Sequence, residues 1–337
     1  MTERLAASGK VFLAGEYAVL SAGRPALVAG IDRKLHARID RSVRGLRLVH
    51  APSGLTWDGG SPPEELRFAA RAAELAVRFC DLVPDARVVF EDEFSLGGHK
   101  LGLGGSAAAC VLTVRAVCAA AGRAISESEL LALAFAAHWA GQGGEGSGAD
   151  MAAAALGGVI EVRSVAAWRS VAELMTMPAP AIAASNPLRI ARVRVPRRLR
   201  LLLAYAGKPA DTRGLVRAVR AFARGDAAAW TRCADAISAA EEKLRDALGS
   251  DDAEPALEAV RTGAAAMAAL GEAAGAPIVT EDLLRACALA SSAGAAAKPS
   301  GAGGGDCAVV LAFGDEARDR AEAALRPQFP VFRIAPA

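Results

Sequence analysis

The sequence predicts an α+β protein made of two mixed halves. Short apolar or alternating runs typical of strands occur in both halves of the 337-residue chain. Long stretches with helical character lie between them, without the strict strand–helix–strand rhythm of a parallel sheet. Residues 178–187 are rich in alanine and proline and lack periodicity, which is typical of a boundary. We therefore expect an N-terminal domain of residues 1–185 and a C-terminal domain of residues 186–337.

The first half contains recognisable strand and helix signals. Residues 35–39 alternate apolar and polar side chains, as a half-buried strand does. The sequence SESE at residues 126–129 has the spacing of a capping box, which begins a helix. The expected strands are residues 11–13, 26–28, 35–39, 46–49, 88–90 and 159–162. The expected helices are residues 62–80, 106–121 and 126–140, followed by a short helical segment that ends at Gly157 and Gly158.

The second half combines fewer strands with longer helices. The expected strands are residues 201–205, 307–313 and 331–334. The expected helices are residues 212–224, 226–248, 253–274 and 280–293. Because strands and helices again mix without a βαβ rhythm, this half is also predicted to be α+β.

Composition excludes several classes of function. The formal net charge of +2 gives no bulk attraction for nucleic acid or an anionic membrane. Charge or glycine interrupts every apolar run before it reaches the length of a membrane span, and residues 1–7 lack the apolar centre of a signal peptide. The six cysteines form no C-x-x-C pair, so we expect reduced thiols. These features indicate a cytoplasmic protein without nucleic-acid or membrane partners. A monomer or a homodimer is expected.

Residues 100–109, KLGLGGSAAA, form the strongest local feature. Three glycines in four positions lead directly into a helix of small residues. Glycine lets backbone N–H groups approach an anion closely, and a helix N-terminus adds positive potential. The pattern therefore suits a phosphate site at which the hydroxyl of Ser106 meets a phosphate or a metal. A flexible loop with Ser106 as an ordinary N-cap is the alternative.

A second glycine-rich block, GQGGEGSGAD at residues 141–150, precedes an alanine-rich helix. Asp150 can be a general base or an electrostatic anchor beside a phosphate, which phosphoryl transfer requires to orient its nucleophile. It can equally be a carboxylate that complements the helix dipole. Glu145 can join Ser106 in holding Mg²⁺, which prefers oxygen ligands, or be a solvated loop carboxylate.

The third block is KPSGAGGGDC at residues 298–307. A hairpin turn is one interpretation, but four glycines within five residues exceed what a turn needs, so close backbone approach to a ligand or another loop is favoured. Asp306 is interpreted as a structural cap.

Lys10 leads into an apolar strand near the N-terminus, where a lysine is normally a solvated edge charge. If it points into a pocket, it can instead stabilise negative charge on a phosphate.

Taken in this order, the blocks resemble the three signature motifs of the GHMP kinases. Residues 8–20 resemble the first motif, residues 100–109 the second (GLGSSAA), and residues 299–306 the third, so the resemblance spans nearly the whole chain. It implies an N-terminal domain with a left-handed βαβ unit, a ferredoxin-like C-terminal domain, and a cleft between them where ATP and substrate meet. Gly105 stands where the family usually has the first serine of a Ser-Ser pair, so a hydroxyl contact is lost there.

Carried over by motif position, the resemblance assigns roles to individual residues. Lys10 and Asp150 match the family's catalytic lysine and aspartate. Ser106 would help to hold Mg²⁺, for which Glu145 is the second expected ligand. The ATP-binding residues would be Lys100, Gly102, Leu103, Gly104, Gly105, Ser106 and Ala107. The substrate-binding residues would be Lys10, Tyr17, Ser147, Gly148, Asp150, Lys208, Arg213, Ser300, Gly301, Ala302 and Gly303.

Within the family, residues 9–20 (GKVFLAGEYAVL) and 207–212 (GKPADT) are most similar to the phosphomevalonate kinases. This implies transfer of the γ-phosphate of ATP to (R)-5-phosphomevalonate, giving 5-diphosphomevalonate in the mevalonate pathway of isoprenoid biosynthesis. A mevalonate kinase, another GHMP kinase or a non-catalytic ligand sensor of the same fold are the alternatives. The candidate cations for this polyanionic substrate are His99, Lys100, Lys208, Arg213 and Lys298. A solvated position on the surface is the alternative for each.

Overall fold

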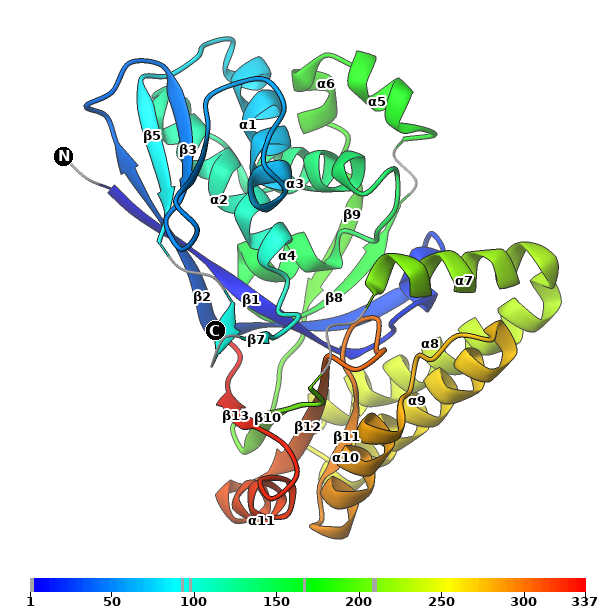
Figure 1. Ribbon diagram of the computed structural model, residues 1–337. Coiled ribbons are helices and arrows are strands. Elements are labelled where there is room, and N and C mark those ends of the chain that lie inside the picture. Colours follow the sequence, from blue (N-terminus) through cyan, green and yellow to red (C-terminus); the bar gives the residue numbers. More distant parts are fainter. Residues whose placement is uncertain (1–2, 92–93, 97–98, 166–167, 208–210) are drawn as a thin grey trace.

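The structure is a computed structural model that describes residues 3–91, 94–96, 99–165, 168–207 and 211–337, with the backbone alone for residues 95–96 and 99–100. The chain folds into two α+β halves, each with its own sheet. Figure 1 shows the N-terminal half, with the larger sheet, above the C-terminal half, with the smaller sheet.

The larger sheet has seven strands within the described residues. They are β1 (Glu3–Ala14), β2 (Pro25–Asp40), β3 (Leu46–His50), β4 (Leu55–Trp57), β5 (Ala86–Phe90), β8 (Gly158–Ser164) and β9 (Leu188–Arg192). Their order is β4-β3-β5-β2-β8-β9, and β1 also pairs with β2. Strands β3 and β5 are parallel and are joined through helix α1 (Arg67–Cys80), which makes the expected βαβ unit. Strands β6 (Ser95–Leu96) and β7 (His99–Lys100) form a separate pair.

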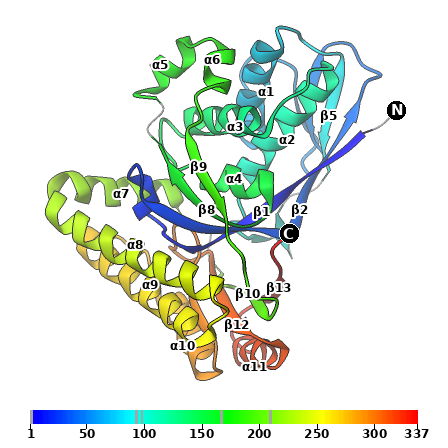
Figure 2. The same cartoon turned by 180° about the vertical axis from the view of Figure 1, so that it is seen from behind.

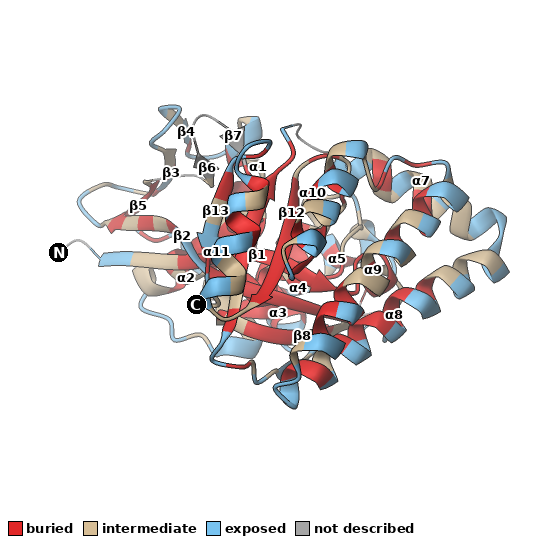
Figure 3. Ribbon diagram, turned by 90° about the horizontal axis from the view of Figure 1, so that it is seen from below, coloured by how far each residue is buried: buried red, intermediate tan, exposed pale blue. Residues whose placement is uncertain are grey.

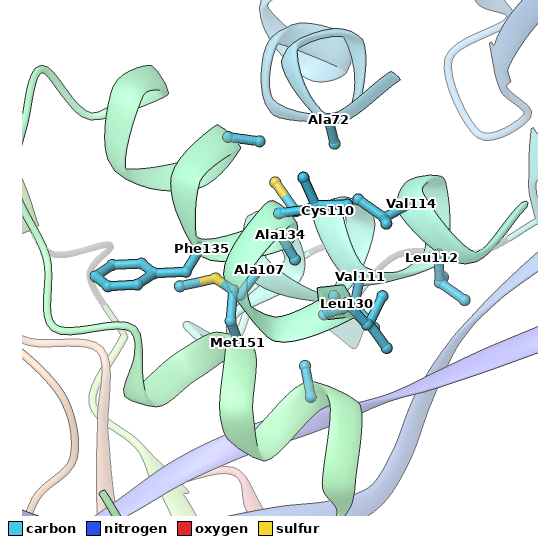
Figure 4. Close-up of a cluster of buried hydrophobic side chains, with 14 of the residues drawn as sticks. Ala72, Ala107, Cys110, Val111, Leu112, Val114, Leu130, Ala134, Phe135 and Met151 are labelled. Atoms are coloured by element: carbon cyan, nitrogen blue, oxygen red, sulfur yellow. The ribbon is translucent and has the colours of Figure 1, made fainter. Parts of the chain in front are cut away.

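Helices cover one face of this sheet (Figure 1). Besides α1 they are α2 (Gly105–Ala120), α3 (Glu127–Gly141), α4 (Ala149–Leu156), α5 (Val171–Thr176) and α6 (Ala179–Ala183), with the short 3-10 turns η1 (Ala18–Leu20) and η2 (Glu64–Leu66). The predicted capping box at the start of α3 is confirmed, since Ser126 and Glu129 each accept a hydrogen bond from the other's backbone N–H. Figure 4 shows how small side chains, such as Ala107 and Ala134, let α2, α3 and α4 pack closely.

The smaller sheet consists of β11 (Ala296–Pro299), β12 (Cys307–Phe313), β10 (Leu199–Tyr205) and β13 (Val331–Ile334), in that spatial order. All neighbours are antiparallel. Along the chain, helices separate β10 from β11, and helix α11 (Asp315–Leu325) separates β12 from β13. This β-α-β-β-α-β order is the ferredoxin-like arrangement, so the fold that the resemblance implies is confirmed.

Four helices follow β10, and the sequence predicted each of them to within one residue at either end. They are α7 (Thr212–Gly225), α8 (Ala227–Gly249), α9 (Ala253–Ala274) and α10 (Glu281–Ser292). Side chains of Asp211, Asp226 and Thr280 accept hydrogen bonds from the first turns of α7, α8 and α10, which explains the sharp starts. The described residues include no helix of sufficient length and apolarity to cross a membrane.

Strands β1 and β2 are buried on both faces, which explains their continuous apolar sequence. Phe12 and Val28 belong to the core beneath the helices of the larger sheet, whereas Val11 and Leu27 pack with the smaller sheet and with α8 and α9. Figure 2 shows these strands running between the two groups of helices, and Figure 3 shows the buried strands enclosed by helices with exposed outer faces. One pair of strands therefore belongs to both cores.

The stretch 178–187, expected at the boundary between the halves, contains helix α6, whose Ile182 is buried. Strand β9 follows it and pairs with β8, so the larger sheet continues past residue 185. The chain also returns to this sheet at its other end, where Pro336 bridges to Ile31 of β2. The division into residues 1–185 and 186–337 stays a prediction.

A buried carboxylate lies where α8 meets the larger sheet. Glu241 is fully buried, and neither of its side-chain oxygens has a hydrogen-bond partner within the described structure. Burial raises the pKa of Glu241 to about 7, the Glu161 carboxylate adds to this rise, and the guanidinium groups of Arg245 and Arg163 oppose it. Glu161 of β8 pairs with Arg245 of α8 at 2.6 Å, so this cluster joins the two halves.

We expect Glu241→Gln to change how stability depends on pH. A glutamate in the unfolded chain ionises near pH 4.5, whereas Glu241 in the folded protein holds its proton up to about pH 7. Its contribution to stability is therefore fully present below pH 4.5 and is lost as the pH rises through 7. The uncharged variant should unfold roughly 5 °C above the wild type at pH 8, since a pKa shift of this size is worth about 3 kcal/mol, and at nearly the same temperature at pH 4. Equal thermal midpoints at pH 8 would show that burial does not raise the pKa of Glu241.

Candidate active site

The three glycine-rich blocks meet at one cavity of about 390 Å³ between the two halves of the molecule. Its wall is formed by β1 and the turn after it, the loops before α2 and α4, the start of α7, and the loop after β11. The residues that line it and that the sequence singled out are Lys10, Tyr17, Gly102, Gly104, Gly105, Ser106, Glu145, Ser147, Gly148, Asp150, Arg213, Ser300, Gly301, Ala302 and Asp306.

Lys10 lies at the centre of this wall. Only 7% of the residue is exposed, so it is not the solvated edge charge that periodicity favours. Its backbone N–H donates to the carbonyl of Leu103, and its Nζ lies 3.4 Å from the carbonyl oxygen of Gly102. The same Nζ is 3.9 Å from Oδ2 of Asp150. The ammonium is therefore held between the loop before α2 and the first turn of α4.

The loop before α2 approaches Lys10 closely because it has no side chains there. Gly102 and Gly104 adopt φ angles of +65° and +82°, which glycine tolerates readily. A Cβ on Gly104 would lie 2.8 Å from Cγ of Lys10, so any other residue would displace the lysine. Helix α2 begins at Gly105, and its free N–H groups are available to an anion at the cavity wall.

Asp150 is placed by the turn that starts α4. Gly148 precedes the helix with a φ of +76°, and a Cβ there would lie 2.7 Å from the Leu188 side chain of β9. The Asp150 side chain is 29% exposed, facing both Lys10 and the cavity. A carboxylate in the first turn is favoured by the helix dipole, and its position beside the Lys10 ammonium adds a second role.

The loop after β11 is tied to the first motif by side-chain hydrogen bonds. Ser300 Oγ accepts from the backbone N–H of Phe12 at 3.0 Å. Tyr17 donates its hydroxyl to the carbonyl of Ala302 at 2.5 Å, and burial raises the Tyr17 pKa, so the phenol stays protonated and keeps this donor. Gly303 packs against the carbonyl of Ile278, where no Cβ would fit, and it does not line the cavity.

Beneath this loop, Lys298 and Glu16 form a fully buried ion pair. The Lys298 ammonium also donates to the carbonyl of Pro299 at 2.6 Å. Lys298 is 1% exposed, so it is not presented to the cavity as a substrate-binding cation. The second carboxylate oxygen of Glu16 has no hydrogen-bond partner among the residues described. The pair connects the turn after β1 to strand β11 of the smaller sheet.

A second cavity of about 360 Å³ lies on the other side of the loop before α2. The two cavities share five wall residues: Phe68, Gly102, Gly104, Gly105 and Ser106. The rest of the second wall is largely apolar, including Leu35, Leu66, Phe90, Phe94 and Leu103, with His50, Glu64 and Glu65 at its polar part. The glycine loop and Ser106 therefore form a wall that is common to both cavities.

Comparison with known proteins identifies the family. Residues 67–158 match the GHMP kinases N terminal domain, and residues 244–331 match the GHMP kinases C terminal domain. A phosphomevalonate kinase of Streptomyces sp. (strain CL190) is 30% identical over 93% of this chain and 90% of its own length. The chain belongs to the GHMP kinase family. It is accordingly a phosphotransferase.

Solved structures agree with this assignment of the GHMP kinase fold. A Lin0012 protein from Listeria innocua superposes with a TM-score of 0.84 at 25% identity, covering 100% of this chain and 99% of its own. The Streptococcus pneumoniae phosphomevalonate kinase, in complex with phosphomevalonate and AMPPNP, superposes with a TM-score of 0.87 at 20% identity, covering 99% of this chain and 100% of its own. The latter likeness concerns the fold alone.

The other residues predicted for this GHMP kinase site take different positions. Leu103 lines the second cavity rather than the first. The Ala107 side chain lies in the hydrophobic core (Figure 4), so only its backbone is left to meet a ligand. Arg213 lies in the first turn of α7 and lines the first cavity. Lys208 and the side chains of His99 and Lys100 lie outside the described residues.

The expected magnesium ligands Ser106 and Glu145 line the same cavity, but Glu145 is paired with Arg220 of α7, Nη1 to Oε1 at 3.4 Å. Across the described part of the chain, no three His, Cys, Asp or Glu residues gather as a metal site. Mg²⁺ is usually held by one or two carboxylates together with substrate phosphates. The oxygen donors Ser106, Glu145 and Asp150 therefore suit an ion that arrives with phosphates, and their role stays a prediction.

The roles of two residues of this GHMP kinase site were not predicted from the sequence. His138 of α3 places its Nε2 2.9 Å from Oγ of Ser106, 32 positions away in the chain, from within an apolar helix. Glu16 belongs to the first motif, but its partner Lys298 is 282 positions away. The spacing of residues along the sequence does not predict either contact. For His138, the available signal was a polar residue within an apolar run.

We expect Lys298→Met to lower the free energy of unfolding by about 3–5 kcal/mol, because Glu16 would become an unpaired buried charge. Denaturant unfolding followed by circular dichroism measures this change. The double variant Glu16→Gln/Lys298→Met leaves no charge and should recover much of the loss. A single variant as stable as the wild type would show that the buried pair does not hold the two motifs together.

Proposed function

We propose that this GHMP kinase transfers the γ-phosphate of ATP to (R)-5-phosphomevalonate and releases ADP and 5-diphosphomevalonate. The observation that carries the proposal is the meeting of Lys10, Asp150 and the glycine loop of α2 at one cavity wall, 3.9 Å separating the ammonium from the carboxylate. The 30% identical phosphomevalonate kinase of Streptomyces supports the choice of acceptor.

In this proposal, ATP spans the two cavities. Its phosphates rest on the backbone N–H groups of residues 102–106 and at the start of α2, where the helix dipole favours negative charge. Its base occupies the second cavity, where Leu35, Phe90 and Phe94 supply an apolar wall. A bound Mg²⁺ would be held by Ser106 and Glu145 together with the ATP phosphates, and would neutralise charge on the β- and γ-phosphates.

The acceptor occupies the first cavity. One of its phosphate oxygens attacks the γ-phosphorus, the bond from that phosphorus to the β-bridging oxygen breaks, and ADP takes the electron pair. Because this oxygen is already anionic, a strong base is not needed. Lys10 reduces the repulsion between acceptor and γ-phosphate, and Asp150 holds the Lys10 ammonium in place.

The remaining charge of the acceptor needs further positive groups. Arg213 faces the cavity from the first turn of α7, and its planar fork suits a phosphate or a carboxylate. Ser147 and the backbone at Gly148 lie at the start of α4, and Ser300, Gly301 and Ala302 bound the opposite wall. Tyr17 contributes indirectly, since its hydroxyl holds Ala302.

A coupled assay of ADP release tests the acceptor. Phosphomevalonate should give the highest kcat/KM among phosphomevalonate, mevalonate, homoserine and galactose. Turnover confined to mevalonate would replace the proposed acceptor, and nucleotide binding without turnover on any acceptor would indicate a ligand sensor.

We expect Lys10→Met to lower kcat by about a hundredfold or more, the scale of losing one preorganised charge contact. Methionine keeps the aliphatic stem that packs on Gly104, so the thermal midpoint should stay close to that of the wild type. Lys34→Ala, which removes an exposed lysine of β2, is the matched control and should keep full activity. Wild-type turnover in Lys10→Met would remove Lys10 from the mechanism.

A further inference from the structure

His138 is a buried polar residue that the proposed reaction does not use. It lies on α3 and is 3% exposed. Its ring stacks on Phe68 with centroids 4.8 Å apart and an interplanar angle of 26°. Its Nε2 lies 2.9 Å from Oγ of Ser106, at the start of α2. The imidazole therefore lies beside the Ser106 hydroxyl, which faces both cavities, and His138 itself lines the first of them.

The buried ring of His138 can meet the Ser106 hydroxyl either as a donor or as an acceptor. A neutral imidazole carries one N–H donor and one bare nitrogen. The contact with Ser106 can therefore be made in two ways, depending on which nitrogen bears the hydrogen.

The surroundings of the second ring nitrogen distinguish these two forms. Nδ1 of His138 is buried and has no hydrogen-bond partner within the described structure. If Nδ1 carried the hydrogen, a donor would be buried without an acceptor, which folded proteins avoid more strictly than an unpaired acceptor. The hydrogen is therefore on Nε2, and His138 donates to Oγ of Ser106.

The direction of this hydrogen bond determines where the hydroxyl hydrogen of Ser106 can point. Serine side chains near a helix start readily turn back to bond the local backbone. A donor fixed at Oγ occupies one lone pair, so the hydroxyl hydrogen must point away from His138. Ser106 lines both cavities, so that hydrogen is available to a ligand oxygen on the glycine loop.

We propose that His138 is a positioning residue, which orients the Ser106 hydroxyl so that it donates to a phosphate oxygen of the nucleotide. The proposal rests on the proposed function, because it requires ATP phosphates at the loop of residues 102–106. His138 also lines the first cavity, but its Nε2 is engaged by Ser106, so in this arrangement it acts on the phosphate through that hydroxyl.

A double-mutant cycle tests this coupling through binding of a non-hydrolysable ATP analogue, measured by calorimetry. His138→Leu should weaken binding about tenfold, the scale of one hydrogen bond to a charged group. His138→Gln keeps an N–H donor near the position of Nε2 and should stay within about threefold of the wild type. In a Ser106→Ala background, His138→Leu should have no further effect. If His138→Leu does not fold, His138→Phe, which preserves the stack on Phe68, replaces it.

The cycle needs a control for general damage to α2. Thr113→Val removes a buried hydroxyl from this helix, one that donates only to the Ala109 carbonyl, and should leave analogue binding unchanged. An effect of His138→Leu that persists in the Ser106→Ala background would overturn the proposal, since a merely structural role gives additive losses. Failure of the wild type to bind the analogue would instead overturn the proposed function.

The tautomer provides a spectroscopic readout that is independent of binding. Nitrogen-15 spectra of histidine-labelled protein should show a protonated Nε2 and an unprotonated Nδ1 for the ring that disappears in His138→Gln. Steady-state kinetics should place the defect of His138→Leu mainly in KM for ATP. A hydrogen on Nδ1 would mean that Ser106 donates to His138, and would contradict the orientation proposed here.

Discussion

The position of the Lys10 ammonium depends on backbone that approaches it without side chains. Gly104 lies against its stem, and a Cβ on Gly301 would come within 3.6 Å of its Nζ. Burial removes most water from the group, so the Asp150 carboxylate and the Gly102 carbonyl fix its place before any ligand binds. A charge held in this way needs no reorganisation during a reaction, which is why preorganised charges are effective in catalysis. Strand β1 supplies the rigid support, because both of its faces are packed.

The two halves of the molecule are joined by contacts of different strength. The Glu16–Lys298 pair is dry and connects the first motif to the third, alongside the hydrogen bonds of Tyr17 and Ser300. Replacing such a pair by apolar residues often costs little, so its value lies less in net stability than in fixing one arrangement. Any other alignment of the turn after β1 with strand β11 would leave one charge of this pair buried without its partner. The pair therefore favours the observed alignment over others.

Much of the fold could be predicted from the sequence because local signals decide it. Helices α7 to α10 have long periodic stretches and side-chain caps, and β12 is a plain apolar run. Helix α11 was missed because it is strongly charged, and β11 because its sequence, AAKP, consists of residues that are uncommon in strands. The site's glycine loops, Lys10 and Asp150 follow from motifs. The partners of Ser106 and Lys298 do not, since those contacts join segments distant in the chain and depend on how the helices and sheets pack.

Strands β1 and β2 also limit how ligands can enter and leave. Because these strands contribute side chains to both cores, moving the two halves apart as rigid bodies would expose apolar surface on each side. Such an opening would cost considerable free energy. Ligand entry and release therefore depend on smaller movements at the rim of the cavity. Helix α7 is suited to them: it packs through a small cluster around Leu215 and Val219, and its Arg220–Glu145 contact is partly in water and therefore weak. Thr212, Arg213 and Val216 of this helix line the cavity, so a displacement of α7 would change how open the site is to solvent.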